Sequence, residues 1–152
     1  MKKIFLILII SLLTSCGYEP LYINKGDFLK NIGNIEKVGN EIVNRRIITL
    51  IGIKADSASS QPHTLKLDSN KDKVIATKDI SGNVKAYKIS IKIKVSIINN
   101  NENSKILKSK EFNSTFIYNI QEDKFQMSQD IRNIENNLIE SVSEKIIIYL
   151  NS

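Results

Sequence analysis

The chain has 152 residues, a formal net charge of +6 and one cysteine, Cys16. This length predicts one domain with a sizeable core, and a single cysteine excludes an intramolecular disulfide. The excess of basic over acidic residues first suggests nucleic acid as a partner. However, the basic residues are not interleaved with aromatic side chains as in single-strand binders, and the exported location inferred below excludes that partner. A negatively charged lipid surface or glycolipid is the better anionic partner.

The first sixteen residues have the form of an export signal. Lys2 and Lys3 precede an apolar run over residues 4–13, which is shorter than the roughly 17 residues needed to span a membrane. Residues 13–16, Leu-Thr-Ser-Cys, look like the bacterial lipobox. They predict a signal peptide over residues 1–15 and lipidation of Cys16. Removing residues 1–15 from the 152 leaves 137, and losing two lysines lowers the charge from +6 to +4. The alternatives are an ordinary signal peptide with a chance cysteine, or an N-terminal anchor helix.

Residues 16–30 are predicted to form a lipidated tether, and residues 31–152 a single domain. Several acyl chains on one cysteine hold a protein firmly to a membrane, whereas one chain binds only marginally. Gly17 and Tyr18 follow the cysteine where Asp or Asn can direct lipoprotein sorting, which favours the outer membrane.

The domain is expected to open with a strand and a helix. Residues 31–38 are consistent with a strand, and Asn40 is a good N-cap for a helix over residues 41–53. Val43, Ile47 and Ile51 recur at helical spacing. Residues 55–62 are small and polar and predict a loop.

Three strand regions are expected next. Residues 63–68 and 73–80 are predicted as strand segments joined or interrupted at residues 69–72. Strict alternation over residues 84–98 predicts a long antiparallel strand with one buried face. A loop at 99–103 returns the chain through a strand at 105–118, where mixed faces indicate a bulge.

The last predicted element is a helix over residues 127–150, with Ser128 as its N-cap. Its apolar stripe is continuous and consists of Met127, Ile131, Ile134, Leu138, Val142, Ile146 and Tyr149. The expected fold is α+β, a two-layer sandwich in which two helices pack on a mostly antiparallel four-stranded sheet, in the order β-α-β-β-β-α.

No pattern of catalytic residues is present in the sequence. There is no Gly-x-Ser-x-Gly elbow and no phosphate-binding glycine loop. His63 is the single histidine, so no metal ligand set or catalytic base pair forms around it. The sequence therefore predicts a binding module that is not an enzyme and uses no cofactor or metal.

Lysines mark the candidate binding surface. Lys88, Lys92 and Lys94 project from one side of the long strand. If the returning strand pairs Lys94 near Lys108 and Lys92 near Lys110, five ammonium groups share a face. Like charges placed opposite each other are unfavourable in a sheet, so the cluster would indicate an anionic lipid ligand. The alternative is a solvated face that protects the sheet from edge pairing.

Two stretches resemble a known family. Residues 13–22, which continue from the lipobox through Cys-Gly-Tyr-Glu-Pro-Leu-Tyr, look like the start of the LPS-assembly lipoprotein family LptE. Residues 114–119, Ser-Thr-Phe-Ile-Tyr-Asn, followed by Phe125 and the long helix, look like that family's final strand and helix. The element order extends the resemblance over nearly the whole mature chain.

The resemblance implies a function. It predicts an outer-membrane lipoprotein that plugs the lumen of the β-barrel protein LptD, helps it assemble, and assists delivery of lipopolysaccharide to the outer leaflet. The two rival predictions are an auxiliary lipoprotein of a lipid-transport ABC system and a purely structural periplasmic lipoprotein.

Overall fold

The computed structural model describes residues 31–53 and 61–152. The predicted signal peptide, tether and lipidation site Cys16 lie outside these residues. The predicted α+β fold and element order are confirmed. The elements are β1 (Ile32–Gly39), α2 (Glu41–Ile51), β2 (His63–Lys78), β3 (Val84–Asn99), β4 (Lys105–Asn119) and α3 (Lys124–Asn151).

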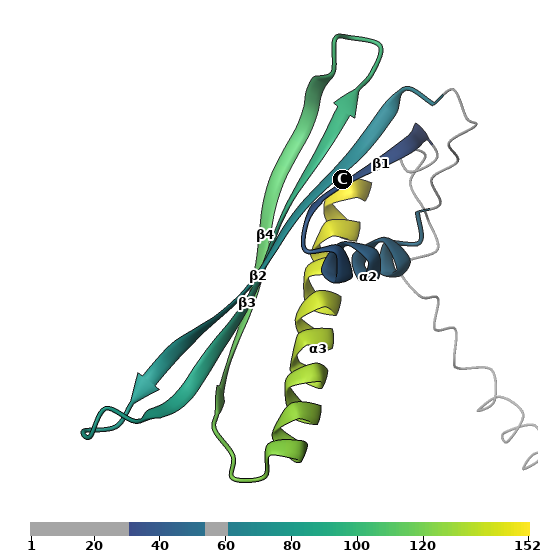
Figure 1. Ribbon diagram of the computed structural model, residues 1–152. Helices are drawn as coiled ribbons and strands as arrows, with labels where there is room; N and C mark the ends of the chain where they lie inside the picture. Colours follow the sequence, from purple (N-terminus) through teal and green to yellow (C-terminus); the bar gives the residue numbers. More distant parts are fainter. Residues whose placement is uncertain (1–30, 54–60) are drawn as a thin grey trace, which may run out of the picture.

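The four strands form one sheet in the order β1-β2-β3-β4. β1 runs parallel to β2, whereas β2 with β3 and β3 with β4 are antiparallel. Figure 1 shows both helices on the same side of this twisted sheet, with the β2–β3 hairpin projecting away from α3. The sheet therefore has a helix side, which is covered, and an open side, which is not.

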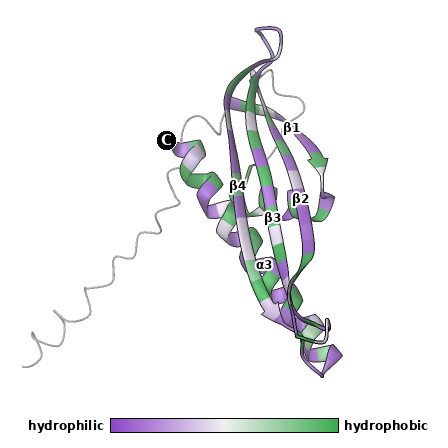
Figure 2. Ribbon diagram, turned by 90° about the vertical axis from the view of Figure 1, so that its left-hand side faces the viewer, coloured by the Kyte–Doolittle hydropathy of each residue, from purple (hydrophilic) through white to green (hydrophobic). Residues whose placement is uncertain are grey.

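The alternation of β3 explains the position of the core. Five apolar residues at every second position are at most 1% exposed and lie on the helix side: Ile89, Ile91, Ile93, Val95 and Ile97. Figure 2 shows hydrophobic and hydrophilic residues alternating along β3. The predicted α3 stripe packs against this core, with Leu138, Val142 and Ile146 buried. Because successive side chains point to opposite faces, the polar half of β3 lies on the open side.

A tight corner joins β1 to α2. The Asn40 side chain accepts a hydrogen bond from the Val43 amide at 3.0 Å, which confirms the predicted N-cap. The Asn40 amide donates to the Ser69 carbonyl of β2 at 2.9 Å. Asn44, although buried, donates from its side chain to the Val38 carbonyl at 2.8 Å. The corner therefore ties both elements to the sheet, and Gly52 ends the helix in a left-handed conformation.

β2 is one continuous strand, so an interruption at residues 69–72 is wrong. Ser69, Lys71 and Lys73 pair with Ile93, Ile91 and Ile89 of β3. The full length of β3 supplies backbone partners there, and these outweigh the low strand propensity of Asn and Asp.

The β2–β3 turn lies at residues 79–83, where the predicted strand segments 73–80 and 84–98 meet. The Asp79 carboxylate accepts hydrogen bonds from the backbone amides of Asn83 and Ser81, both at 2.9 Å. The hydrogen bond from the Asn83 amide is the main reason that the pKa of Asp79 lies below its ordinary value. This carboxylate closes the turn in its ionised form.

α3 begins one turn earlier than predicted, because its N-cap is Asp123 and not Ser128. The Asp123 carboxylate accepts hydrogen bonds from the amides of Phe125 at 2.8 Å and Gln126 at 3.0 Å. Asp is as good an N-cap as Ser, and the apolar stripe starts only at Met127, so the pattern placed the start too late.

Candidate functional site

The register of β3 and β4 separates the five predicted lysines. Lys94 pairs with Glu111, and Lys92 pairs with Asn113. The pairing of Lys94 near Lys108 and of Lys92 near Lys110, which was the condition for five lysines on one face, is therefore not formed. Lys108 and Lys110 pair instead with Ile97 and Val95, whose side chains lie in the core. Lys88, Lys92 and Lys94 are on the open side, while Lys108 and Lys110 are on the helix side.

A bulge in β4 contributes to this register. Ile98 pairs with Ile106, whereas Ile97 pairs with Lys108, so Leu107 has no partner in β3. An extra residue in one strand reverses which face the following side chains occupy. The predicted bulge is confirmed near the start of β4. It places Ile106 on the open side and the lysines that follow it on the helix side.

The open-side lysines lie among polar and acidic neighbours. Lys94 has Asp68 on one side and Glu111 on the other. Lys92 lies between two asparagines, and Lys88 between two apolar side chains. Opposite charges in adjacent strands stabilise a sheet. The open side is therefore a mixed polar surface on which Lys94 has two acidic neighbours, although within residues 31–53 and 61–152 none of its lysines Lys88, Lys92 and Lys94 forms an ion pair.

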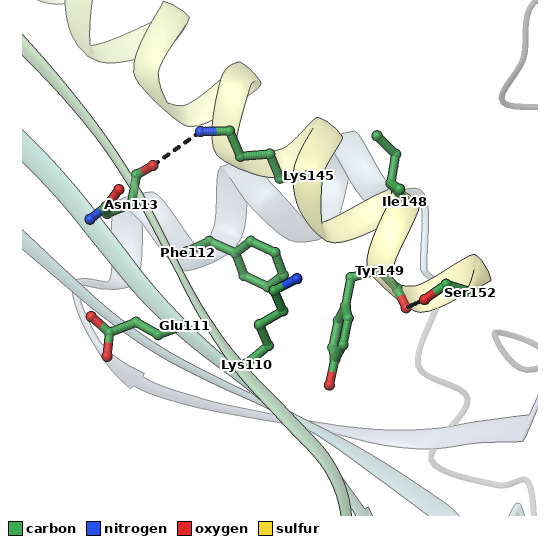
Figure 3. Close-up of a pocket in the computed structure, with 8 residues that line it drawn as sticks. All are labelled: Lys110, Glu111, Phe112, Asn113, Lys145, Ile148, Tyr149 and Ser152. Carbon is green, nitrogen blue, oxygen red and sulfur yellow. Dashed lines mark hydrogen bonds between the residues drawn. The ribbon is translucent and has the colours of Figure 1, made fainter.

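Lys110 lines a groove between β4 and the last turns of α3, and Lys108 lies beside this groove, next to the Tyr149 ring. This groove has a volume of about 450 Å³, and Figure 3 shows the eight residues that line it. Lys110 and Phe112 come from β4, and Lys145 and Tyr149 come from α3. The Lys145 ammonium donates to the Asn113 carbonyl at 3.2 Å and so connects the two walls.

Two aromatic rings position the ammonium groups. The Lys108 Nζ lies 5.6 Å from the centroid of the Tyr149 ring, and the Lys110 Nζ lies 5.5 Å from the same centroid. Phe112 packs edge-on against Tyr149 with 5.5 Å between centroids. Cations are attracted to aromatic faces within about 6 Å. Burial raises the pKa of Tyr149 above its ordinary value, so its hydroxyl is neutral and can donate a hydrogen bond.

We call Lys108, Lys110, Lys145, Phe112 and Tyr149 the lysine–tyrosine groove. Within residues 31–53 and 61–152, none of its three lysines forms an ion pair with a carboxylate. Glu111 lines the rim, but its side chain points away from the tyrosine ring in Figure 3. Cations without acidic partners, next to exposed apolar surface, are suited to an anionic group attached to an apolar body.

Lys145 and Tyr149 were not predicted as site residues. Tyr149 belongs to the apolar stripe and Lys145 lies beside it, so the stripe alone indicates a core role. The sequence feature that could have linked them is their spacing, because residues four apart lie on the same face of a helix. Placing that face beside Lys110 requires the strand register.

The described part of the chain has no group of three metal-binding side chains. His63 lies at the start of β2. Within the same residues, no helix has the length and apolar character required to cross a membrane.

No protein-family model matches the sequence, and a comparison with curated proteins finds no match. Solved structures do match. The rare lipoprotein B of Shewanella oneidensis has a TM-score of 0.56 and 11% identity, and the match covers 77% of this chain and 92% of that one. Lipoprotein B of Nitrosomonas europaea has a TM-score of 0.59 and 10% identity, with coverage of 76% and 80%. A minor lipoprotein of Acinetobacter baumannii has a TM-score of 0.53 and 6% identity, with coverage of 78% and 90%.

These likenesses show that the chain has the fold of bacterial lipoproteins over about three quarters of its length. At such identities the shared property is the fold, and function has to be argued from the site.

Proposed function

We propose that this chain is an LptE-type lipoprotein of the outer membrane. It is anchored through Cys16, occupies the lumen of an LptD-type β-barrel, helps that barrel assemble, and assists delivery of lipopolysaccharide to the outer leaflet. Its mechanism is binding and positioning, without catalysis, cofactor or metal.

One combination of observations supports the proposal. The sequence places a lipobox ending at Cys16 before the domain, and the domain has the β-α-β-β-β-α fold of bacterial lipoproteins. One fold can serve many functions. A lipobox ahead of this fold adds a second likeness to the lipoproteins of known structure, because it predicts the same export and lipid attachment.

The lysine–tyrosine groove is the part of the domain best suited to lipopolysaccharide. Lys110 and Lys145 offer ammonium groups to the phosphates of the glycolipid, and Tyr149 and the exposed Ile148 offer apolar surface beside them. The open-side lysines Lys88, Lys92 and Lys94 remain a second candidate surface, on which Asp68 and Glu111 beside Lys94 lower the local positive charge.

The experiment that tests the function is purification of the full-length lipidated protein from its own membrane in a mild detergent, followed by mass spectrometry of the proteins bound to it. We expect a stoichiometric outer-membrane barrel of the LptD type. Inner-membrane permease or lipid-carrier subunits would instead favour an auxiliary lipoprotein of an ABC transport system. Recovery of the chain without any partner would favour a purely structural lipoprotein.

A further inference from the structure

The described sheet has four edge segments whose outer backbone groups pair with no other strand. β1 forms one edge over residues 32–39. Residues 70–78 of β2 form a second, because β1 pairs only with residues 63–69 of β2. β4 is the opposite edge of the sheet, and its bulged first half, residues 105–111, differs from its second half, residues 112–119. Figure 2 shows β4 running along the outside of the sheet.

Three of these edge segments carry charges. Glu36 and Lys37 lie on the β1 edge, and Lys105, Lys108, Lys110 and Glu111 lie on the first half of β4. The β2 edge carries Lys71, Asp72, Lys73 and Lys78. Charged side chains, short strands and bulges are the usual means by which proteins prevent edge-to-edge pairing.

Residues 112–119 of β4, Phe-Asn-Ser-Thr-Phe-Ile-Tyr-Asn, are the one described edge segment without a charged side chain. We call this segment the uncharged edge. It is rich in aromatic and β-branched residues, which favour strand pairing. Phe116 is 48% exposed and Ile117 is 58% exposed. The outer backbone amides and carbonyls of the uncharged edge lie beside these exposed apolar side chains. Another extended strand could pair with the backbone groups and cover the apolar side chains.

There is room for such a strand on the helix side. A second groove of about 480 Å³ separates residues 116–119 from the first half of α3. Asn133 and Asn137 of α3 line it, and the one charged lining residue, Asp130, accepts hydrogen bonds from the side chains of Gln121 and Gln126. At the other end of the segment, Lys145 already bonds the Asn113 carbonyl, so the open backbone runs from about Ser114 to Asn119.

We propose that the uncharged edge pairs with the same segment of a second copy of this chain, antiparallel and about a two-fold axis. A two-fold contact brings identical residues close together, so like charges oppose it at a charged edge, whereas the uncharged edge has no charged side chain of its own to oppose it. Each described domain has one such segment, and its other edges are charged. The pairing therefore closes at two copies and does not continue into a filament.

An axis at Phe116 gives a consistent register. It places Phe116 opposite its counterpart, Thr115 opposite Ile117, and Ser114 opposite Tyr118, with each pair on one face of the joined sheet. Aromatic and β-branched pairs of this kind stabilise antiparallel strands. The pair also covers apolar side chains that the single chain exposes.

Sedimentation of the full-length lipidated protein in density-matched detergent micelles tests this pairing in the free chain, independently of any barrel partner. We expect a dimer that dissociates on dilution. Thr115→Lys adds a cation to the uncharged edge and should raise the dimer dissociation constant by about tenfold or more. Thr77→Lys is the matched control, because Thr77 is also exposed and lies on the charged β2 edge. This variant should dimerise like the wild type.

A thiol variant supplies a second measurement that does not depend on the behaviour of Thr115→Lys. Phe116→Cys should form disulfide-linked dimers under mild oxidation, because the axis brings the two thiols together. Ile75→Cys, at a position with the same 48% exposure, should form few. A wild-type chain that stays monomeric at high concentration overturns the proposal, as do larger oligomers or equal cross-linking of the two thiol variants.

Discussion

At the scale of single residues, Gly39 shows how closely the first helix is fitted to the sheet. Its φ angle is +82°, and a Cβ atom there would overlap the backbone carbonyl of Ser69. That carbonyl also accepts the hydrogen bond from the Asn40 amide. Gly82 has a similar φ of +86°, but open space surrounds it. The two glycines therefore share the requirement for a left-handed backbone and differ in whether a neighbour blocks the side chain.

We predict that Gly39→Ala destabilises the domain more than Gly82→Ala. The Gly82 variant bears only the backbone strain, which costs roughly 1–2 kcal/mol. The Gly39 variant bears the same strain and must also open the β1–α2 corner and weaken the Asn40–Ser69 hydrogen bond. Urea unfolding followed by far-UV circular dichroism measures both free energies. Equal losses would show that the corner relaxes without cost.

The lysines of the groove support a second prediction at this scale. Replacing Lys110 and Lys145 by glutamine should weaken binding of purified lipopolysaccharide to the full-length protein by roughly tenfold, which is 1.4 kcal/mol. Replacing Lys92 and Lys94 removes the same charge from the open side and should have a smaller effect, since Lys94 already lies between Asp68 and Glu111. Titration calorimetry gives the affinities. An open-side pair that weakens binding more would move the site to that face.

At the scale of elements, α3 stabilises the fold through one face. Ile146 is fully buried against the sheet, whereas Ile148, two residues later, is 66% exposed. Ile146→Ala should reduce the free energy of unfolding by about 2–5 kcal/mol, because it removes core contacts and leaves a cavity. Ile148→Ala should change it by no more than about 0.5 kcal/mol. The same urea unfolding measurement compares them. A large loss at Ile148 would mean that this face of the helix is covered.

The elements also show what sequence patterns can and cannot predict. The alternation of residues 84–98 correctly predicts β3 and its buried face, because a two-residue period of apolar side chains is enough to identify the buried face of a strand. The pairing of β4 depends on details that the period does not contain. The hairpin turns through Asn103 and Ser104, which have positive φ angles, and Leu107 forms a bulge.

These details move the partner of Lys94 from Lys108 to Glu111, three positions along. An odd shift moves every side chain of a strand to the other face. This shift therefore divides the five lysines of the predicted binding surface between two sides of the sheet. It also places Lys110 beside Lys145 and Tyr149. The start of α3 was missed for a local reason, because the cap at Asp123 lies ahead of the apolar stripe.

At the scale of the whole molecule, the described chain enters the fold at the end of the sheet where the lysine–tyrosine groove lies. Ile32 pairs with His63, which pairs with Asn99 at the base of the β3–β4 hairpin. Lys108 and Lys110 follow that hairpin, and Tyr149 is in the last turn of α3. A lipid attached to Cys16 would be sixteen residues before Ile32, so the chain between them could span at most about 58 Å.

This arrangement makes attachment separable from folding. Cys16→Ser removes the proposed acylation site and leaves every described contact unchanged. We therefore expect the variant to unfold at the same urea concentration as the wild type and to leave the membrane fraction. Ser15→Ala keeps a small residue before the cysteine and should remain membrane-bound. If Cys16→Ser also stays in the membrane fraction, the apolar run of residues 4–13 is acting as an uncleaved anchor. The domain would then be attached to the bilayer by the polypeptide and not by a lipid.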